Sequence, residues 1–100
     1  MTPESQIKKE IKKYLESIGA FWSAVTGGGY SKPGDPDLIA CFHGRYIAIE
    51  AKTPTGVQSP IQKKRMAEIK EAGGVYILAR SVEDVAEVIE DLWAEQDYDI

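Results

Sequence analysis

The strongest constraint on the fold comes from two apolar segments, residues 36–42 and 45–52, separated only by the dipeptide His43-Gly44. Both segments are short for helices, and a two-residue connection that ends in Gly is typical of a tight β-hairpin. The sequence therefore predicts an antiparallel hairpin in which Phe42 pairs with Arg45 and pairing continues outwards residue by residue. A turn one residue longer would move every side chain to the other face of the sheet.

This register places two acidic residues opposite each other. Asp37 faces Glu50, with Cβ atoms about 5 Å apart, and Lys52 shares the face of Glu50 because side chains alternate with a period of two. Like charges at this distance are destabilising. A divalent cation could bridge them, Lys52 could pair with them, or one acid could hold a proton.

The surroundings of these charges indicate a functional site rather than a solvated surface. Both strands carry apolar residues on both faces, so we expect them inside a sheet, where unpaired charges are costly. Carboxylate oxygens on a small site suit Mg²⁺ or Mn²⁺. The alternative is a structural or regulatory protein in which Asp37, Glu50 and Lys52 form a buried salt-bridge network.

The rest of the chain predicts helices and strands on both sides of the hairpin, in the order α-β-β-β-α-β-α. Thr2-Pro3 and Ser59-Pro60 are typical helix starts, and Gly19 and Gly73-Gly74 are typical helix ends. The expected elements are a helix at 3–18, strands at 21–25, 36–42, 45–52 and 75–79, a glycine-rich loop at 26–34, a helix from 60 to about 72, and a helix after Ser81 followed by an acidic tail at about 95–100. This order predicts one α/β domain over residues 1–100.

Composition excludes several classes of protein. A single cysteine, Cys41, excludes an internal disulfide, and a single histidine, His43, argues against a histidine-based metal or catalytic cluster. No apolar run approaches the roughly 20 residues needed to cross a bilayer. The first residues do not resemble a signal peptide, so we expect a cytoplasmic protein with no membrane partner.

Two helical residues are candidates for the same site. Glu4 projects into the apolar stripe of the first helix, toward the sheet, although it could serve only to stabilise the helix start. Gln62 projects toward the inner side of the second helix. There it could bind a water, a metal ligand or a phosphate, or it could be satisfied by backbone groups.

The charge distribution is asymmetric, although the net charge is −4. Residues 1–65 contain ten basic and six acidic residues, whereas residues 66–100 contain two and ten. An acidic chain can therefore still carry an anion-binding face, although solvated helix faces would give the same pattern. The candidate phosphate-binding residues are Tyr30 and Lys32 in the glycine-rich loop and the basic run Lys63, Lys64 and Arg65.

Taken in order, these residues resemble the PD-(D/E)xK nuclease superfamily and, within it, the VRR-NUC domain (virus-type replication-repair nuclease). A lone Asp…Glu-x-Lys pattern is weak, whereas the ordered set on elements of the expected type is specific. The resemblance covers residues 4 to about 90. It rests on Glu4, Pro36-Asp37, Glu50-Ala51-Lys52 and Gln62, supported by Gly34-Asp35-Pro36-Asp37-Leu38-Ile39, Ser59-Pro60-Ile61-Gln62 and Gly73-Gly74.

The resemblance implies a restriction-endonuclease-like core, with a mixed β-sheet flanked by helices, and cleavage of DNA phosphodiesters that depends on Mg²⁺ or Mn²⁺. Asp37, Glu50 and Glu4 would ligate the metal ion. Lys52 would orient or activate the attacking water and offset developing charge, and Gln62 would support these groups.

The resemblance also implies branched DNA, of the Holliday-junction or flap type, as the substrate in repair, recombination or phage replication. It further implies a homodimer, compatible with a helicase partner, in the cytoplasm of a bacterium or a phage-infected host cell. Asp35 departs from the family pattern, and the hairpin register predicts that it pairs with Lys52. The alternative is a non-catalytic nucleic-acid-binding module on the same fold.

Overall fold

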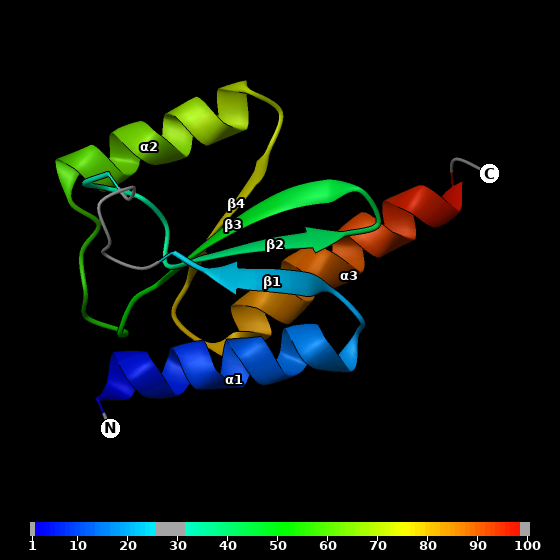
Figure 1. Ribbon diagram of the computed structural model, residues 1–100, viewed down its shortest axis with the longest axis horizontal. Helices are drawn as coiled ribbons and strands as arrows, with labels where there is room; N and C mark the ends of the chain where they lie inside the picture. The colour runs from blue at the N-terminus through cyan, green and yellow to red at the C-terminus, as the bar shows by residue number, and fades with distance from the viewer. Residues whose placement is uncertain (1, 26–31, 99–100) are drawn as a thin grey trace.

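The computed structural model describes residues 2–25 and 32–98 and confirms the expected order of elements. No helix in this part of the chain is both long enough and apolar enough to span a bilayer. Tyr30, a predicted DNA contact, lies outside the described residues. The elements are α1 (Pro3–Ser17), β1 (Phe21–Ala24), β2 (Leu38–Phe42), β3 (Arg45–Ala51), α2 (Pro60–Glu71), β4 (Val75–Ala79) and α3 (Val82–Tyr98) (Figure 1).

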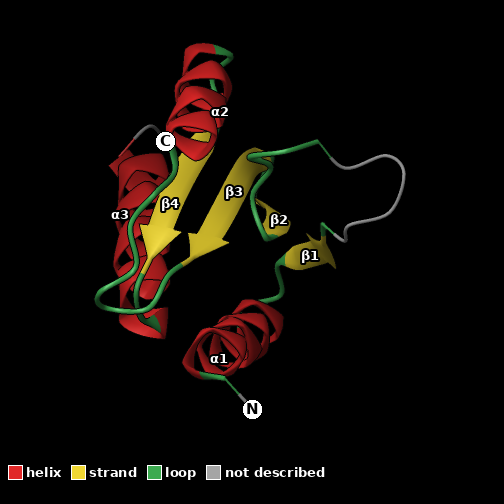
Figure 2. Ribbon diagram, turned by 90° about the vertical axis from the view of Figure 1, so that its left-hand side faces the viewer, coloured by secondary structure: helices red, strands yellow, loops and turns green. Residues whose placement is uncertain are grey.

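The sheet is mixed, with the strand order β1-β2-β3-β4. β1, β2 and β3 pair antiparallel, whereas β4 is parallel to β3 and is reached through α2 (Figure 2). A parallel neighbour requires such a crossover, because the chain must return to the same end of the sheet. The result is a mixed sheet flanked by helices, the arrangement that the sequence resemblance implies.

The hairpin has the predicted register. Phe42 pairs with Arg45, and the ladder continues to the pair of Leu38 and Ile49. His43 and Gly44 have φ angles of 49° and 78°, which is the left-handed geometry that a two-residue turn between twisted strands requires. The prediction that β2 and β3 meet across a two-residue turn is therefore confirmed.

Two helices and one face of the sheet enclose the core. Ile11 and Leu15 of α1 and Val85 and Ile89 of α3 are buried against this face. α2 has no buried residue and contacts β4. The core residues of the sheet are Leu38, Ala40, Ile47, Ile49, Ile77 and Ala79.

The helix ends follow the capping signals with one difference. Thr2 and Ser59 cap α1 and α2 through bonds from the backbone N–H groups of Ser5 and Gln62. α3 continues to Tyr98, beyond the expected start of the acidic tail near residue 95. The helical backbone bonds extend past the last apolar contact of α3 with the core, which is where the sequence pattern ends.

Candidate active site

Glu50 lies on β3, on the face of the sheet opposite the helical core. Its neighbours Ile49 and Ala51 point into the core, so the alternation of side chains directs Glu50 the other way. The residue is 1% exposed. Its Oε1 accepts hydrogen bonds from the Tyr76 hydroxyl and, at 3.1 Å, from Gln58 Nε2. A buried carboxylate is thus held in one orientation by two neutral donors.

The second oxygen of Glu50 has a different environment. Oε2 is buried and accepts no hydrogen bond from residues 2–25 or 32–98, and Lys52 Nζ lies 3.9 Å away. A buried charged oxygen without a bonded partner is costly. A hard cation bound to Oε2 would satisfy this oxygen.

Asp37 is fixed beside Glu50 by the backbone. Its N–H donates to the carbonyl of Ile49 at 3.0 Å, and its carbonyl accepts from the N–H of Val25 at 2.9 Å. Its Oδ2 accepts from the N–H of Ala51 at 2.8 Å. The carboxylate of Asp37, which directly precedes β2, is therefore bonded to the residue that follows Glu50 in β3.

The charges of both carboxylates affect the pKa of Tyr76. Burial raises the pKa of Tyr76 well above its ordinary value of 10.0, and the hydrogen bond to Glu50 and the charges of Glu50 and Asp37 raise it further. The hydroxyl therefore stays protonated at neutral pH and serves as a hydrogen-bond donor.

Lys52 follows the end of β3 and keeps the predicted orientation. Its backbone N–H donates to the carbonyl of Ala79 at 2.9 Å, so β4 anchors the residue next to the site. Its side chain is 19% exposed and points toward Glu50. The ammonium group of Lys52 thus lies near the buried carboxylate of Glu50, and its side chain is partly exposed to solvent.

The predicted pairing of Asp35 with Lys52 is wrong. The regular ladder ends at Leu38, and Asp35 instead pairs with Arg65 of α2, with 3.4 Å between Oδ1 and Nε. Asp35 Oδ2 also accepts from the backbone N–H of Lys32 at 2.7 Å. The extrapolated register fails because the chain leaves the sheet before Asp37 and turns toward α2.

Gln62 has a capping contact. Its Oε1 accepts from the backbone N–H of Ser59 at 2.8 Å, and the hydroxyl of Ser59 accepts from the N–H of Gln62. This reciprocal pair is a capping box, which fixes the first turn of α2. The bond corresponds to the backbone-satisfied alternative that the sequence left open.

Glu4 lies in the first turn of α1, where its Oε1 is 3.9 Å from Lys8 Nζ. Among the described residues, no cluster of three or more His, Cys, Asp or Glu side chains could hold a metal ion. The ligand role of Glu4 remains a prediction.

The remaining basic candidates differ in their environments. Lys32, Lys63 and Lys64 are exposed. Arg65 is bonded within the chain, since it donates to Glu68 Oε1 at 2.6 Å and to the carbonyl of Pro33 at 3.1 Å. Arg65 thus connects α2 to the segment before β2.

Sequence reasoning missed two residues that contact Glu50, namely Tyr76 and Gln58. Tyr76 comes beside Glu50 because Ala48 pairs with Tyr76 in the parallel ladder, and that register cannot be read before the crossover is known. Gln58 lies one residue before the cap of α2, and no motif singles it out.

Comparison with solved structures places this architecture among known folds. The chain is similar to a structure described as a VRR_NUC domain, with a TM-score of 0.77 and 24% sequence identity over 90% of this chain and 97% of that one. It is also similar to Hjc, a Holliday junction resolvase of Archaeoglobus fulgidus, with a TM-score of 0.56 and 21% identity over 73% of this chain and 64% of that one.

The fold is thus one that known nuclease domains use. Within it, this chain has the architecture of the VRR_NUC domain, as the sequence resemblance implies. No protein-family model and no curated protein matches the sequence.

Proposed function

We propose that this protein is a metal-dependent endodeoxyribonuclease. The observation that carries the proposal is the buried Oε2 of Glu50, which accepts no hydrogen bond from any described residue and lies 3.9 Å from Lys52 Nζ. A salt-bridge network built only for stability would satisfy this oxygen. A site that binds a cation leaves it open.

Glu50 and Asp37 would hold Mg²⁺ or Mn²⁺, with Glu4 as the further ligand that the sequence predicts. When bound, the ion supplies Lewis acidity at the scissile phosphate and lowers the pKa of an attacking water. Tyr76 and Gln58 fix Glu50 through Oε1, so that the orientation of Oε2 is set before the ion binds. Preorganisation of this kind reduces the cost of binding.

Lys52 acts on the reacting groups. Its ammonium lies near Glu50 and is partly exposed, so it can donate hydrogen bonds to the attacking water and to a non-bridging phosphate oxygen. Both contacts become stronger as negative charge develops on the phosphate. We propose that Gln62 is a positioning residue, because its capping box fixes the start of α2 next to Gln58.

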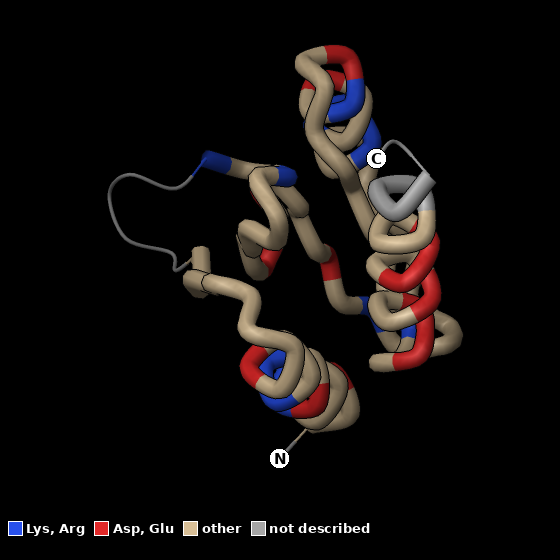
Figure 3. The backbone as a smooth tube through the Cα atoms, turned by 90° about the vertical axis from the view of Figure 1, so that its right-hand side faces the viewer, with Lys and Arg blue, Asp and Glu red and all other residues tan. Residues whose placement is uncertain are grey.

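The substrate that we propose is branched DNA, of the Holliday-junction or flap type. The Hjc neighbour, described as a Holliday junction resolvase, supports this choice. The charge distribution supports an approach away from α3, because acidic residues lie along this helix (Figure 3). We propose Lys32, Lys63 and Lys64 as contacts to the DNA backbone.

We also propose a homodimer, since two sites related by a two-fold axis can cut two strands symmetrically. Action beside a helicase in the cytoplasm is compatible with this role. Light scattering after gel filtration tests the assembly, and a monomer at micromolar concentration would contradict symmetric cleavage of a junction.

Cleavage of labelled DNA tests the activity. Plasmid, flap and four-way-junction substrates are incubated with the protein and Mn²⁺, Mg²⁺ or a chelator. We expect cleavage that requires the metal and falls at least about 100-fold in Lys52→Ala, whereas Lys70→Ala, a surface change on α2, leaves it within about twofold. Junction binding without cleavage under every condition would favour a non-catalytic nucleic-acid-binding module.

A further inference from the structure

A pocket lies on the same side of the sheet as Glu50, between the start of β3 and α2. It has a volume of about 580 Å³ and is lined by Tyr46, Ile69, Gly74 and two arginines, Arg45 and Arg65. This volume is in the range of about 300–1,000 Å³ that is typical of pockets for small molecules and cofactors. None of the proposed catalytic residues lines it.

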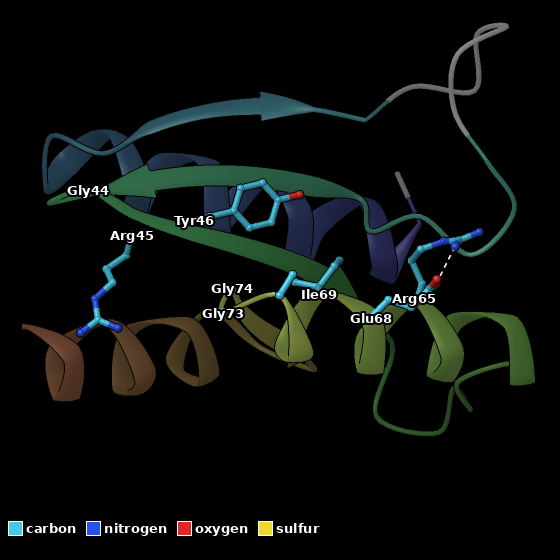
Figure 4. Close-up of a pocket in the computed structure, with 9 residues that line it drawn as sticks. Gly44, Arg45, Tyr46, Arg65, Glu68, Ile69, Gly73 and Gly74 are labelled. Carbon is cyan, nitrogen blue, oxygen red and sulfur yellow. Dashed lines mark hydrogen bonds and ion pairs between the residues drawn. The ribbon is translucent and has the colours of Figure 1, made fainter.

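Tyr46 presents an aromatic surface to this pocket. The residue is 45% exposed, and its ring lies over Ile69 (Figure 4). Gly74 makes this position possible, because a Cβ there would lie 3.0 Å from Tyr46 Cδ1 and 2.8 Å from Ile69 Cγ2. The ring is thus supported by backbone and remains accessible for stacking.

The charges around the pocket favour a nucleotide base over a free phosphate as its ligand. Arg65 is balanced, since it pairs with Glu68 and Asp35. Arg45 is exposed and forms no ion pair within residues 2–25 and 32–94. In Figure 4, Arg45 lies at the end of the pocket opposite Arg65. The pocket therefore offers an apolar, nearly neutral interior with one available cation at its rim.

We propose that this pocket binds one unpaired nucleotide of the DNA substrate, with its base stacked on Tyr46 and its phosphate near Arg45. Stacking on an aromatic side chain tolerates any base, which suits an enzyme that recognises DNA structure rather than sequence. The inference rests on the proposed nuclease function and names the feature of the substrate that the enzyme would recognise.

The distance to the active site supports this assignment. Tyr46 and Glu50 share one face of β3 and are four residues apart, which is about 13 Å along a strand. One strand of B-DNA rises about 3.4 Å per nucleotide, so this span corresponds to at most about four nucleotides. An unpaired nucleotide in the pocket would thus place the nearby duplex junction at the catalytic groups.

Fluorescence of 2-aminopurine, placed as an unpaired base in a flap substrate, tests binding apart from cleavage. With a chelator present to prevent cutting, we expect wild-type protein to quench the probe, because its base stacks on Tyr46. We expect Tyr46→Phe to retain the quenching and Tyr46→Ala to weaken affinity for the flap about tenfold or more. Thermal melts check that both variants are folded.

A matched duplex with a nick and no unpaired base provides the second comparison. Tyr46→Ala should lower the ratio of flap cleavage to nicked-duplex cleavage relative to wild type, since the pocket has no ligand in the nicked duplex. Equal quenching by wild type and Tyr46→Ala, or no quenching by a wild type that cuts the flap, would overturn the inference. Quenching that depends on Tyr46 without any cleavage would support the pocket and overturn the nuclease. If the wild type shows neither quenching nor cleavage, the nucleotide pocket and the nuclease function are both overturned.

Discussion

Replacement of Tyr76 with Phe tests how the buried carboxylate is held. The Tyr76 hydroxyl donates a hydrogen bond to Oε1 of Glu50. Gln58 Nε2 donates to the same oxygen. Tyr76→Phe removes one oxygen atom and leaves the ring, which is 8% exposed, in its packed position. The change therefore removes the hydrogen bond with little change in volume.

The expected loss follows from the charge of the acceptor. A hydrogen bond to a charged group contributes about 1.5–3 kcal/mol, more than a bond between neutral groups. For a domain of this length, a loss of about 2 kcal/mol lowers Tm by about 8–16 °C. We expect Tyr76→Phe to lower the free energy of unfolding by about 1.5–3 kcal/mol at pH 7, in the absence of metal.

Urea denaturation followed by circular dichroism measures this loss. Tyr46→Phe is the matched control, because Tyr46 is half-exposed and its hydroxyl forms no hydrogen bond with the described residues; we expect a change under about 0.5 kcal/mol. In a double-mutant cycle with Glu50→Gln, we expect a coupling energy of about 1 kcal/mol, because charge-assisted bonds are about twice as strong as neutral ones. Equal stability of Tyr76→Phe and Tyr46→Phe would refute the reasoning.

The pH dependence provides an independent check. The pKa of Tyr76 is raised in the folded protein, so above pH 10 the unfolded chain loses this proton first. The resulting contribution to stability is complete below about pH 10 and is lost as the pH rises toward the folded pKa. Wild type should therefore lose more stability than Tyr76→Phe between pH 9 and pH 11, and parallel curves would contradict the assignment.

Two further pairs of variants test the positioning of the site. Gln62→Ala should destabilise the protein by about 1 kcal/mol in urea denaturation and slow cleavage. Gln62→Glu should preserve stability and cleavage, because Glu also forms a capping box with Ser59. Equal loss of cleavage in the two variants would indicate a direct catalytic role of Gln62. Gly34 has a φ of 86° and a Cβ there would lie 2.7 Å from the carbonyl of Ile61, whereas Gly19, with a φ of 77°, has open space. We expect Gly34→Ala to cost at least about 1 kcal/mol more than Gly19→Ala in the same assay, and equal costs would show that this contact is not required.

The hairpin could be predicted from sequence because its determinants are local. A two-residue turn sets the pairing of every residue beyond it, so the opposition of β2 and β3 follows from the position of His43-Gly44. The extrapolation fails at Asp35, where the segment is bonded to Arg65 instead of to β3. Regular pairing gives no information on where a strand stops.

The surroundings of Glu50 could not be predicted in the same way. Tyr76 reaches this carboxylate through the register of β3 and β4, which depends on how α2 crosses between them. Gln62 is half-buried, and helical periodicity does not reveal that its oxygen caps its own helix. Long-range register and local competition for backbone groups thus limit what can be read from the sequence.

The two-residue turn also has a consequence for the evolution of the chain. Insertion of one residue at His43-Gly44 would shift the register of β3 by one residue and turn each of its side chains to the opposite face of the sheet. Glu50 would then enter the apolar layer between the sheet and helices α1 and α3. Burial of a carboxylate among aliphatic side chains is costly, so misregistered chains would be unstable and not merely inactive. The same acid that we place in catalysis thereby ensures that the hairpin length is under selection for folding as well as for activity.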